Sequence, residues 1–286
     1  MWLEKFIKKQ FIAFYKDEEY KLILQTIKNK KTIFTEEKIF EEKKELISYI
    51  NEKIEESPQT YVSTMLLSIN QGVVPSCSRH DYLDKDIDPD NVKILCLGKY
   101  SFFVSIYELA NIKKEYGFEI DFIYSVFAVI DALAKERKNR FYVLALKEYI
   151  VVLGYENFIP IYSDIQSFND EDEEEDEDED IDIVEDIDLE EDLISDINAV
   201  EEELTEEIES SENISIEARI LNTLKNSIKE YYHNYSSDFI EKIIILDTIG
   251  LDISLNTLIE EELLITSEIK QIDLLNSINR LSIESI

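Results

Sequence analysis

The feature that most constrains the fold of this 286-residue chain is a pattern that occurs twice, about 130 residues apart. The first copy starts at Lys8 and the second at Lys138. Each copy has a basic entry, an apolar strand, a short charged turn and a second strand that begins at a tyrosine, Tyr20 or Tyr149. Apolar runs on either side of a short polar turn are typical of β-hairpins. Two similar hairpins at the heads of two half-chains predict a duplicated α/β fold.

The composition indicates a folded protein with one unusual segment. Hydrophobic residues make up 44% of the chain, which is long enough to bury a sizeable core. Residues 170–212 hold 26 acidic side chains and no Lys or Arg, and without them the formal net charge changes from −35 to −9. Because contacts to nucleic-acid phosphates require Lys and Arg, this balance argues against direct nucleic-acid binding.

The acidic segment has two parts with different patterns. Residues 170–180 are a pure charge run, which predicts disorder through self-repulsion. Over residues 183–208, Ile, Leu and Val recur at helical intervals, which predicts an acidic amphipathic helix. Such a helix is expected either to pack on the parent domain or to dock on a basic partner.

The cysteines and the apolar stretches indicate in which cellular compartment the protein acts. Cys77 and Cys96 lie in unrelated contexts without metal-ligand spacing, so we expect no disulfide framework and a reducing cytoplasm. Residues 58–78 are poor in charge, but Ser, Thr, Asn, Gln, Gly and Pro interrupt them, which is a poor pattern for a membrane span. Residues 1–9 lack a continuous apolar core, so we expect a short leader that packs on the domain rather than a signal peptide.

Hydrophobic periodicity predicts secondary structure along most of the chain. Residues 71–90 are expected to be rich in loops, and the residues after 264 a tail with at most one short helix. The predicted strands cover residues 11–15, 20–27, 32–38, 59–69, 92–97, 120–123, 141–146, 149–154, 158–162 and 242–246, and the predicted helices cover residues 42–56, 102–116, 126–136, 215–232 and 255–263.

The order of three strands, a helix and a strand, followed by its repeat, resembles the actin-like plan. The chain is similar in this respect to the actin-like assembly proteins of type IV pilus and type II secretion machines, the PilM and GspL families. The resemblance implies an α/β, actin-like (ribonuclease H-like) two-lobed fold with mixed sheets, interrupted by a disordered acidic insert. It rests on residues 14–24 for the first hairpin, residues 93–97, 102–116 and 118–124 for the connector, and residues 221–232, 243–247 and 255–263 for the last elements.

The resemblance also implies a division of the chain. Residues 1–136 would form the first lobe, with the family's inserted subdomain reduced to about residues 71–90. Residues 137–168 would start the second lobe, and residues 169–212 would form the acidic insert, disordered and then helical. Residues 213–286 would complete the second lobe.

The nucleotide-binding turns of this family are not present in recognisable form. Glycine in such turns lets backbone N–H groups approach phosphates, because there is no Cβ in the way. Phe14 stands at the family's Asp position and Lys16 at its Gly position, the second turn before Lys147 has neither, and the third holds only Gly250. Lys16 and Lys147 lie beside carboxylates that repel a nucleotide. We therefore expect no cofactor, no catalytic residue and no small-molecule substrate.

Other candidate chemistry is sparse. His80 and His233 are far apart in the sequence and have no ligands at metal-binding spacing. Cys77 and His80 are three residues apart, but a Cys–His dyad needs an electropositive setting, and Asp81 adjoins it. The acidic loop with Asp86, Asp88 and Asp90 lacks the Gly and the final Glu of an EF-hand. We therefore expect no metal site, and these residues to belong to solvated loops and surfaces.

The function that the resemblance implies is a non-catalytic cytoplasmic scaffold at the inner membrane. It would serve a type IV pilus, type II secretion or DNA-uptake (competence) assembly platform, bind the cytoplasmic tail of an inner-membrane partner through about residues 61–98, and couple it to an assembly ATPase. Two alternatives remain open: a remodelled nucleotide- or metal-binding enzyme of actin-like fold, and an acidic binding protein that mimics a polyanion.

Overall fold

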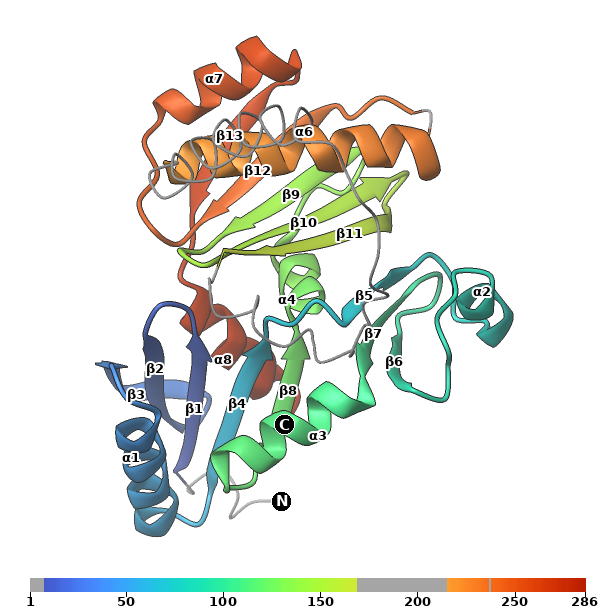
Figure 1. Ribbon diagram of the computed structural model, residues 1–286. Helices are drawn as coiled ribbons and strands as arrows, with labels where there is room; N and C mark the ends of the chain where they lie inside the picture. Colours follow the sequence, from blue (N-terminus) through green and yellow to red (C-terminus); the bar gives the residue numbers. More distant parts are fainter. Residues whose placement is uncertain (1–7, 169–214, 237) are drawn as a thin grey trace, which may run out of the picture.

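The computed structural model describes residues 8–168, 215–236 and 238–286. Two five-stranded sheets with the same strand order form its core (Figure 1). This repeat confirms the duplicated α/β fold. The first sheet has the order β3 (Lys31–Phe40), β2 (Tyr20–Lys28), β1 (Lys9–Lys16), β4 (Thr60–Leu66), β8 (Phe122–Ser125), and the second has the order β11 (Ile159–Ser167), β10 (Tyr149–Glu156), β9 (Arg140–Ala145), β12 (Lys242–Asp247), β13 (Ser267–Gln271).

Both sheets are mixed in the same way. β1 and β9 each pair antiparallel with the next strand of their hairpin and parallel with a strand that comes later in the chain. The hairpin registers match Lys16 with Tyr20 in the first sheet and Ala145 with Ile150 in the second. As a result, the two hairpin turns occupy equivalent positions in the two halves.

Helices cover the outer face of each sheet. α1 (Lys43–Glu56) packs Leu46 and Ile50 against Phe14 of β1. α6 (Ile216–Asn234) packs Ile220 and Leu224 against Phe141 of β9, with α7 (Ser254–Leu263) beside it. The apolar residues on these helices recur at helical spacing, so burying that stripe stabilises helix and sheet together.

Two more helices lie between the sheets (Figure 1): α4 (Val126–Leu133) and α8 (Leu274–Glu284). A single apolar cluster joins Ala13 of the first sheet, Leu144 of the second, Ile130 of α4 and Ile278 of α8. α8 therefore packs on the first sheet although it is the last element of the chain. The two halves share a core, so their relative position is set by packing.

A small antiparallel sheet lies between β4 and β8 in the sequence. It has the order β5 (Gln71–Val74), β7 (Ser101–Ser105), β6 (Val92–Cys96), with α2 (Arg79–Leu83) in its loop and α3 (Ile106–Tyr116) after it. The sheet reaches Ser105, whereas the predicted subdomain ended at residue 90. Gly72 allows β5 to approach the second sheet closely, since a Cβ there would lie 2.9 Å from the Phe103 ring and 3.0 Å from Ser163 Oγ.

The structure corrects two predictions in this region. Residues 71–90 are rich in loops, as predicted, and also contain β5 and α2. The predicted helix 102–116 begins only at Ile106, because residues 101–105 pair with both β5 and β6 as β7, and the Ser105 hydroxyl then caps α3. The strand predicted over residues 92–97 is confirmed as β6, but the expectation that it is buried is wrong, because its residues are half-buried or exposed at the edge of the small sheet.

The cysteine prediction is also wrong, because Cys77 and Cys96 form a disulfide with Cα atoms 5.6 Å apart. The fold of the small sheet brings the end of β6 beside the segment that leads into α2, a proximity that the sequence contexts do not reveal. The predicted tail contains β13, which pairs parallel with β12, before α8.

Two of the remaining predictions, the disorder of residues 170–180 and the helix over 183–208, lie outside the described residues. Within the described part of the chain, no helix is long and apolar enough to cross a membrane.

Candidate functional site

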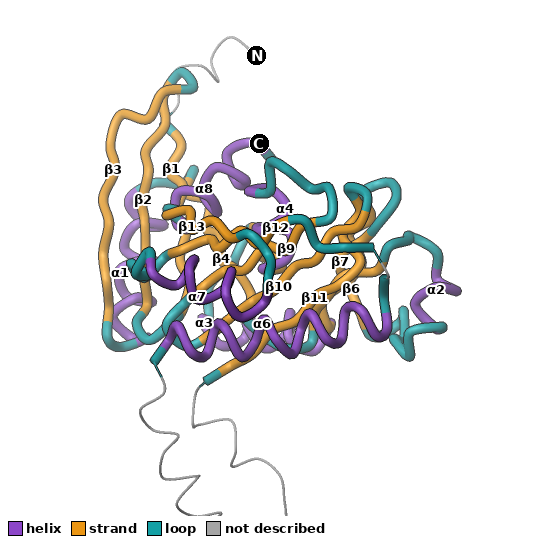
Figure 2. Tube along the Cα trace, turned by 90° about the horizontal axis from the view of Figure 1, so that it is seen from above, coloured by secondary structure: helices purple, strands orange, loops and turns teal. Residues whose placement is uncertain are grey.

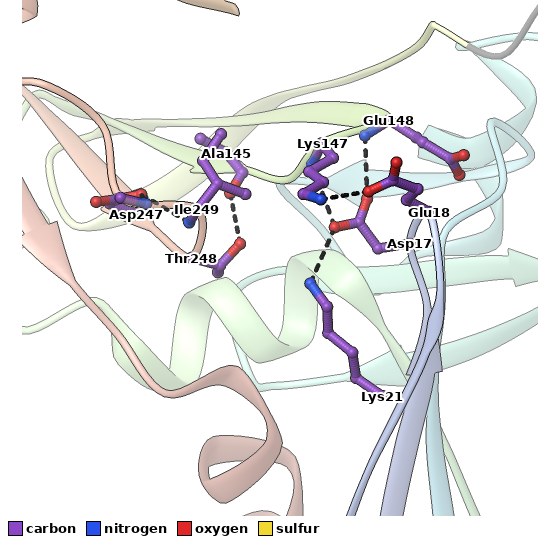
Figure 3. A network of polar contacts seen from close by, with 10 residues as sticks. Asp17, Glu18, Lys21, Ala145, Lys147, Glu148, Asp247, Thr248 and Ile249 are labelled. Atoms are coloured by element: carbon purple, nitrogen blue, oxygen red, sulfur yellow. Dashed lines mark hydrogen bonds and ion pairs between the residues drawn. The ribbon is translucent and has the colours of Figure 1, made fainter. Parts of the chain in front are cut away.

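The candidate site lies where the two hairpin turns meet, between the sheets (Figure 3). Asp17 follows β1 in the first turn, and Lys147 and Glu148 form the second turn before β10. In a duplicated fold of this kind, equivalent turns from the two halves face each other across the junction. Any group that both turns bind must therefore sit between them.

The Asp17 carboxylate occupies this position. Asp17 is fully buried, and its two oxygens accept hydrogen bonds from the backbone N–H groups of Lys147, at 3.2 Å, and Glu148, at 3.0 Å. The Lys21 ammonium lies 3.4 Å from the same carboxylate. Hydrogen bonds to an ionised acceptor are stronger than those between neutral groups. Asp17, which lies in the first turn, thus links that turn to the second (Figure 3).

An exposed ion pair reinforces this contact at the surface. The Lys147 ammonium pairs with the Glu18 carboxylate across the junction. The hydrogen bond and charge of Lys147 lower the pKa of Glu18, and the same pair raises the pKa of Lys147. Because both side chains are largely exposed, solvent screens their attraction, and the buried Asp17 contact is the stronger link.

A third turn follows β12 and has its own internal anion. The Asp247 carboxylate is buried and accepts hydrogen bonds from the N–H groups of Ile249 and Gly250, both at 2.9 Å, and of Leu251, at 3.0 Å. The Thr248 hydroxyl donates to the carbonyl of Ala145 at 2.8 Å, which ties this turn to the end of β9 (Figure 3).

Asp17 and Asp247 together accept hydrogen bonds from five backbone N–H groups of the second and third turns. Successive N–H groups in turns are the feature by which a backbone binds phosphate. Here the donors already bind carboxylates of the same chain, and a phosphate would have to displace a buried, hydrogen-bonded charge. Leaving a buried charge without its hydrogen-bond partners costs free energy, which phosphate binding would have to offset.

The residues singled out from the sequence have different positions. Lys147 is part of the junction, whereas Lys16 is exposed at the end of β1. His80 is exposed on α2, 3.7 Å from Asp84, and His233 is exposed on α6. Cys77 is bonded to Cys96, so it forms no dyad with His80.

The carboxylates of Asp88 and Asp90 in the acidic loop contact other residues of the same chain. The Asp88 carboxylate accepts from the N–H of Asp90 and from the side chain of Asn91, and Asp90 pairs with Arg79 at 2.9 Å. Among the described residues, no group of three or more His, Cys, Asp or Glu side chains is arranged to hold a metal ion.

Sequence reasoning missed the role of two acidic residues. The carboxylates beside Lys16 and Lys147, Asp17 among them, were interpreted as groups that repel a nucleotide, and the hydrogen bonds that Asp17 accepts from the second turn were not predicted. The position of Asp17 in a turn that matches the turn at Lys147 was the available signal. Asp247 was noted only as part of a turn that contains Gly250, although an Asp just after a strand commonly accepts hydrogen bonds from its own loop.

Two family models match most of the chain. Residues 140–286 match the model of a family described as "Domain of unknown function (DUF8341)", and residues 6–131 match one described as "Domain of unknown function (DUF8569)". No curated protein matches the chain.

Three solved structures are similar to the model. The first is a Bacteroides thetaiotaomicron protein with an actin-like ATPase fold and unknown function (10% identity, TM-score 0.50, 97% of this chain and 95% of that one). The second is the cytoplasmic domain of EpsL, an inner-membrane component of the Vibrio cholerae type II secretion system (11%, 0.45, 97% and 96%). The third comes from a PilM–PilN type IV pilus biogenesis complex (12%, 0.49, 93% and 89%). At these identities the likeness shows the fold, which is actin-like.

Proposed function

The chain belongs to the DUF8341 domain family and has the actin-like fold, and from this premise we propose that it is a non-catalytic scaffold. It would act on the assembly platform of a type IV pilus, type II secretion or DNA-uptake machine. There it would bind the cytoplasmic tail of an inner-membrane protein and link it to an assembly ATPase.

The observation that carries the proposal is the buried carboxylate of Asp17 between the two hairpin turns. Its hydrogen bonds to the N–H groups of Lys147 and Glu148 use the donors that a bound phosphate would need. An actin-like protein whose halves are joined by its own side chain needs no nucleotide to hold them together. Such a protein is suited to presenting a fixed surface, which is what a scaffold requires.

The proposed surface for the partner's tail is the region of residues 61–98, which includes β5, α2 and β6. Leu83, Leu95 and Leu97 are exposed there, on or beside α2 and the edge strand β6. Exposed apolar side chains grouped on one small sheet are a common basis for binding a peptide segment. The proposed location is cytoplasmic, at the inner membrane through this partner.

Site-specific photo-cross-linking in cells tests this proposal. A photoreactive amino acid at Leu95 or Leu97 is expected to capture a protein of the membrane fraction with a single membrane span. The matched control is the same amino acid at Leu258, which is exposed on α7, far from α2 and the small sheet (Figures 1 and 2). Equal capture from both positions, or capture of soluble proteins alone, contradicts the proposed surface.

Deletion of residues 170–212 separates the scaffold from a polyanion mimic. A scaffold keeps its fold and its membrane partner without the acidic segment, because the proposed surface lies on the small sheet. A protein whose function is polyanion mimicry loses everything that it binds, since the deletion removes 26 of its 64 acidic residues.

A further inference from the structure

The outer edge of β3 has no partner in the described part of the chain. β3 is the last strand of the first sheet and pairs only with β2 (Figure 2). All ten of its residues are exposed or half-buried, and Phe34 and Ile39 are 51% and 61% exposed. Edge strands that are long and partly apolar tend to pair with another strand.

The matching strand of the second sheet is covered instead. No residue of β11 is exposed, and β5 of the small sheet lies against it, with the N–H of Val73 donating to Ser163 Oγ at 3.1 Å. α6 packs above it and places Thr223 Oγ1 2.8 Å from Gln166. The two halves of the fold therefore differ at this edge, and only β3 is left open.

The sequence of β3 is complementary to itself. Phe34, Glu36, Lys38 and Phe40 alternate along the face that carries α1, where Phe40 and Lys38 lie 5.6 and 4.1 Å from the ring of Tyr49. In an antiparallel pair of two β3 strands about a twofold axis at residue 37, Phe34 lies opposite Phe40 and Glu36 opposite Lys38. Each pair occurs twice, because the axis relates the two copies.

We propose that β3 pairs antiparallel with β3 of a second copy of this chain. The two first sheets then form one continuous sheet, with both α1 helices on the same face. Two aromatic pairs and two opposite-charge pairs cross the new edge, and cross-strand pairs of both kinds stabilise sheets. This interface is independent of the junction at Asp17 and of the proposed partner surface.

The same register limits the strength of the dimer. On the opposite face Thr35 lies against Ile39 of the second copy, and Glu37 lies against itself. Like charges directly opposite each other are destabilising. A single strand pair also buries less than the about 1,600 Å² of a standard stable interface. We therefore expect a reversible dimer whose population depends on protein concentration.

Sedimentation equilibrium of the full chain at several concentrations tests the interface through charge exchange. Glu36→Lys places two lysines opposite lysines, and Lys38→Glu places two glutamates opposite glutamates. Each single variant is expected to weaken dimerisation about tenfold or more. An equimolar mixture of the two variants restores opposite charges in both pairs, so it should form a heterodimer. The Glu36→Lys, Lys38→Glu double variant should recover the homodimer.

The mixture is decisive because a local effect within one copy cannot produce it. Glu37→Thr, which removes the like-charged pair, should tighten the dimer. Lys93→Glu, on the edge strand β6, should leave it unchanged as the matched control. A chain that stays monomeric at every concentration overturns the proposal, and so does a mixture of the single variants that associates no better than either alone. A circular dichroism spectrum of each variant checks that it is folded.

Discussion

Replacing Asp17 by alanine is expected to destabilise the protein substantially, because it removes the link between the two hairpin turns. The side chain is fully buried and accepts hydrogen bonds from the backbone of Lys147 and Glu148, with the Lys21 ammonium 3.4 Å away. A hydrogen bond to a charged group contributes about 1.5–3 kcal/mol to stability. In the variant, water can reach the exposed end of the second turn and replace part of the lost hydrogen bonding, so we expect the free energy of unfolding to fall by about 3 kcal/mol.

Urea denaturation followed by circular dichroism measures this loss as a shift of the midpoint. The matched control is Glu18→Ala, which changes the neighbouring carboxylate in the same turn and removes only the exposed pair with Lys147. The midpoint of this control should stay close to that of the wild type. Equal midpoints for the two variants would refute the reasoning, because they would mean that the buried contact of Asp17 holds nothing together.

Three further predictions follow from other parts of the structure. Opening the disulfide of the small sheet, by reduction or by Cys77→Ser, should lower the free energy of unfolding by about 3 kcal/mol, as expected for a loop whose ends are 19 residues apart. If the protein acts in the cytoplasm, alkylation in intact cells should find both thiols reduced, whereas a persistent disulfide contradicts that location. Burial, with the carboxylate of Asp131 beside it, raises the pKa of Tyr100 to about 12. The folded state thus holds this proton more tightly, so the stability that Tyr100 contributes is present below its ordinary pKa of about 10 and is lost as the pH rises toward 12. In an alkaline titration followed by tyrosinate absorbance, Tyr100→Phe should reduce the change near pH 12 by the contribution of one tyrosine, and an unchanged titration curve would contradict this. Gly72→Ala should destabilise the protein by about 1–3 kcal/mol, because the new methyl group meets the ring of Phe103; an unchanged thermal midpoint would show that the small sheet is not packed as described.

The elements that the sequence predicts well are those whose pattern is local. β1 and β9 are buried on both faces, with Phe14 in the cluster that contains α1 and Ala13 in the cluster that contains α8, so the hairpins were recognisable as apolar runs joined by charged turns. α1 and α6 carry apolar stripes at helical spacing. The duplication followed from these elements alone, without any knowledge of how the halves pack.

The elements that the sequence predicts poorly depend on distant partners. β7 begins at Ser101 with two phenylalanines and a valine, which continue naturally into the apolar pattern of α3, and only its pairing with β5 and β6 makes it a strand. β13 has no fully buried residue, and its parallel pairing with β12 defines it.

The candidate site was out of reach for the same reason. Asp17 and Lys147 are 130 residues apart, and the packing of α4 and α8 between the sheets brings their turns together. Charge alone indicated repulsion of a nucleotide at this position. The direction of the carboxylate, toward backbone donors of the other half, was needed to show that an anion is already present.

Isothermal titration of the full-length protein with Mg-ATP tests most directly whether Asp17 takes the place of a nucleotide. No heat of binding is expected beyond that of dilution, because the donors of the second turn already bind the Asp17 carboxylate. Saturable binding in the micromolar range would contradict the account and would support a nucleotide-dependent enzyme instead.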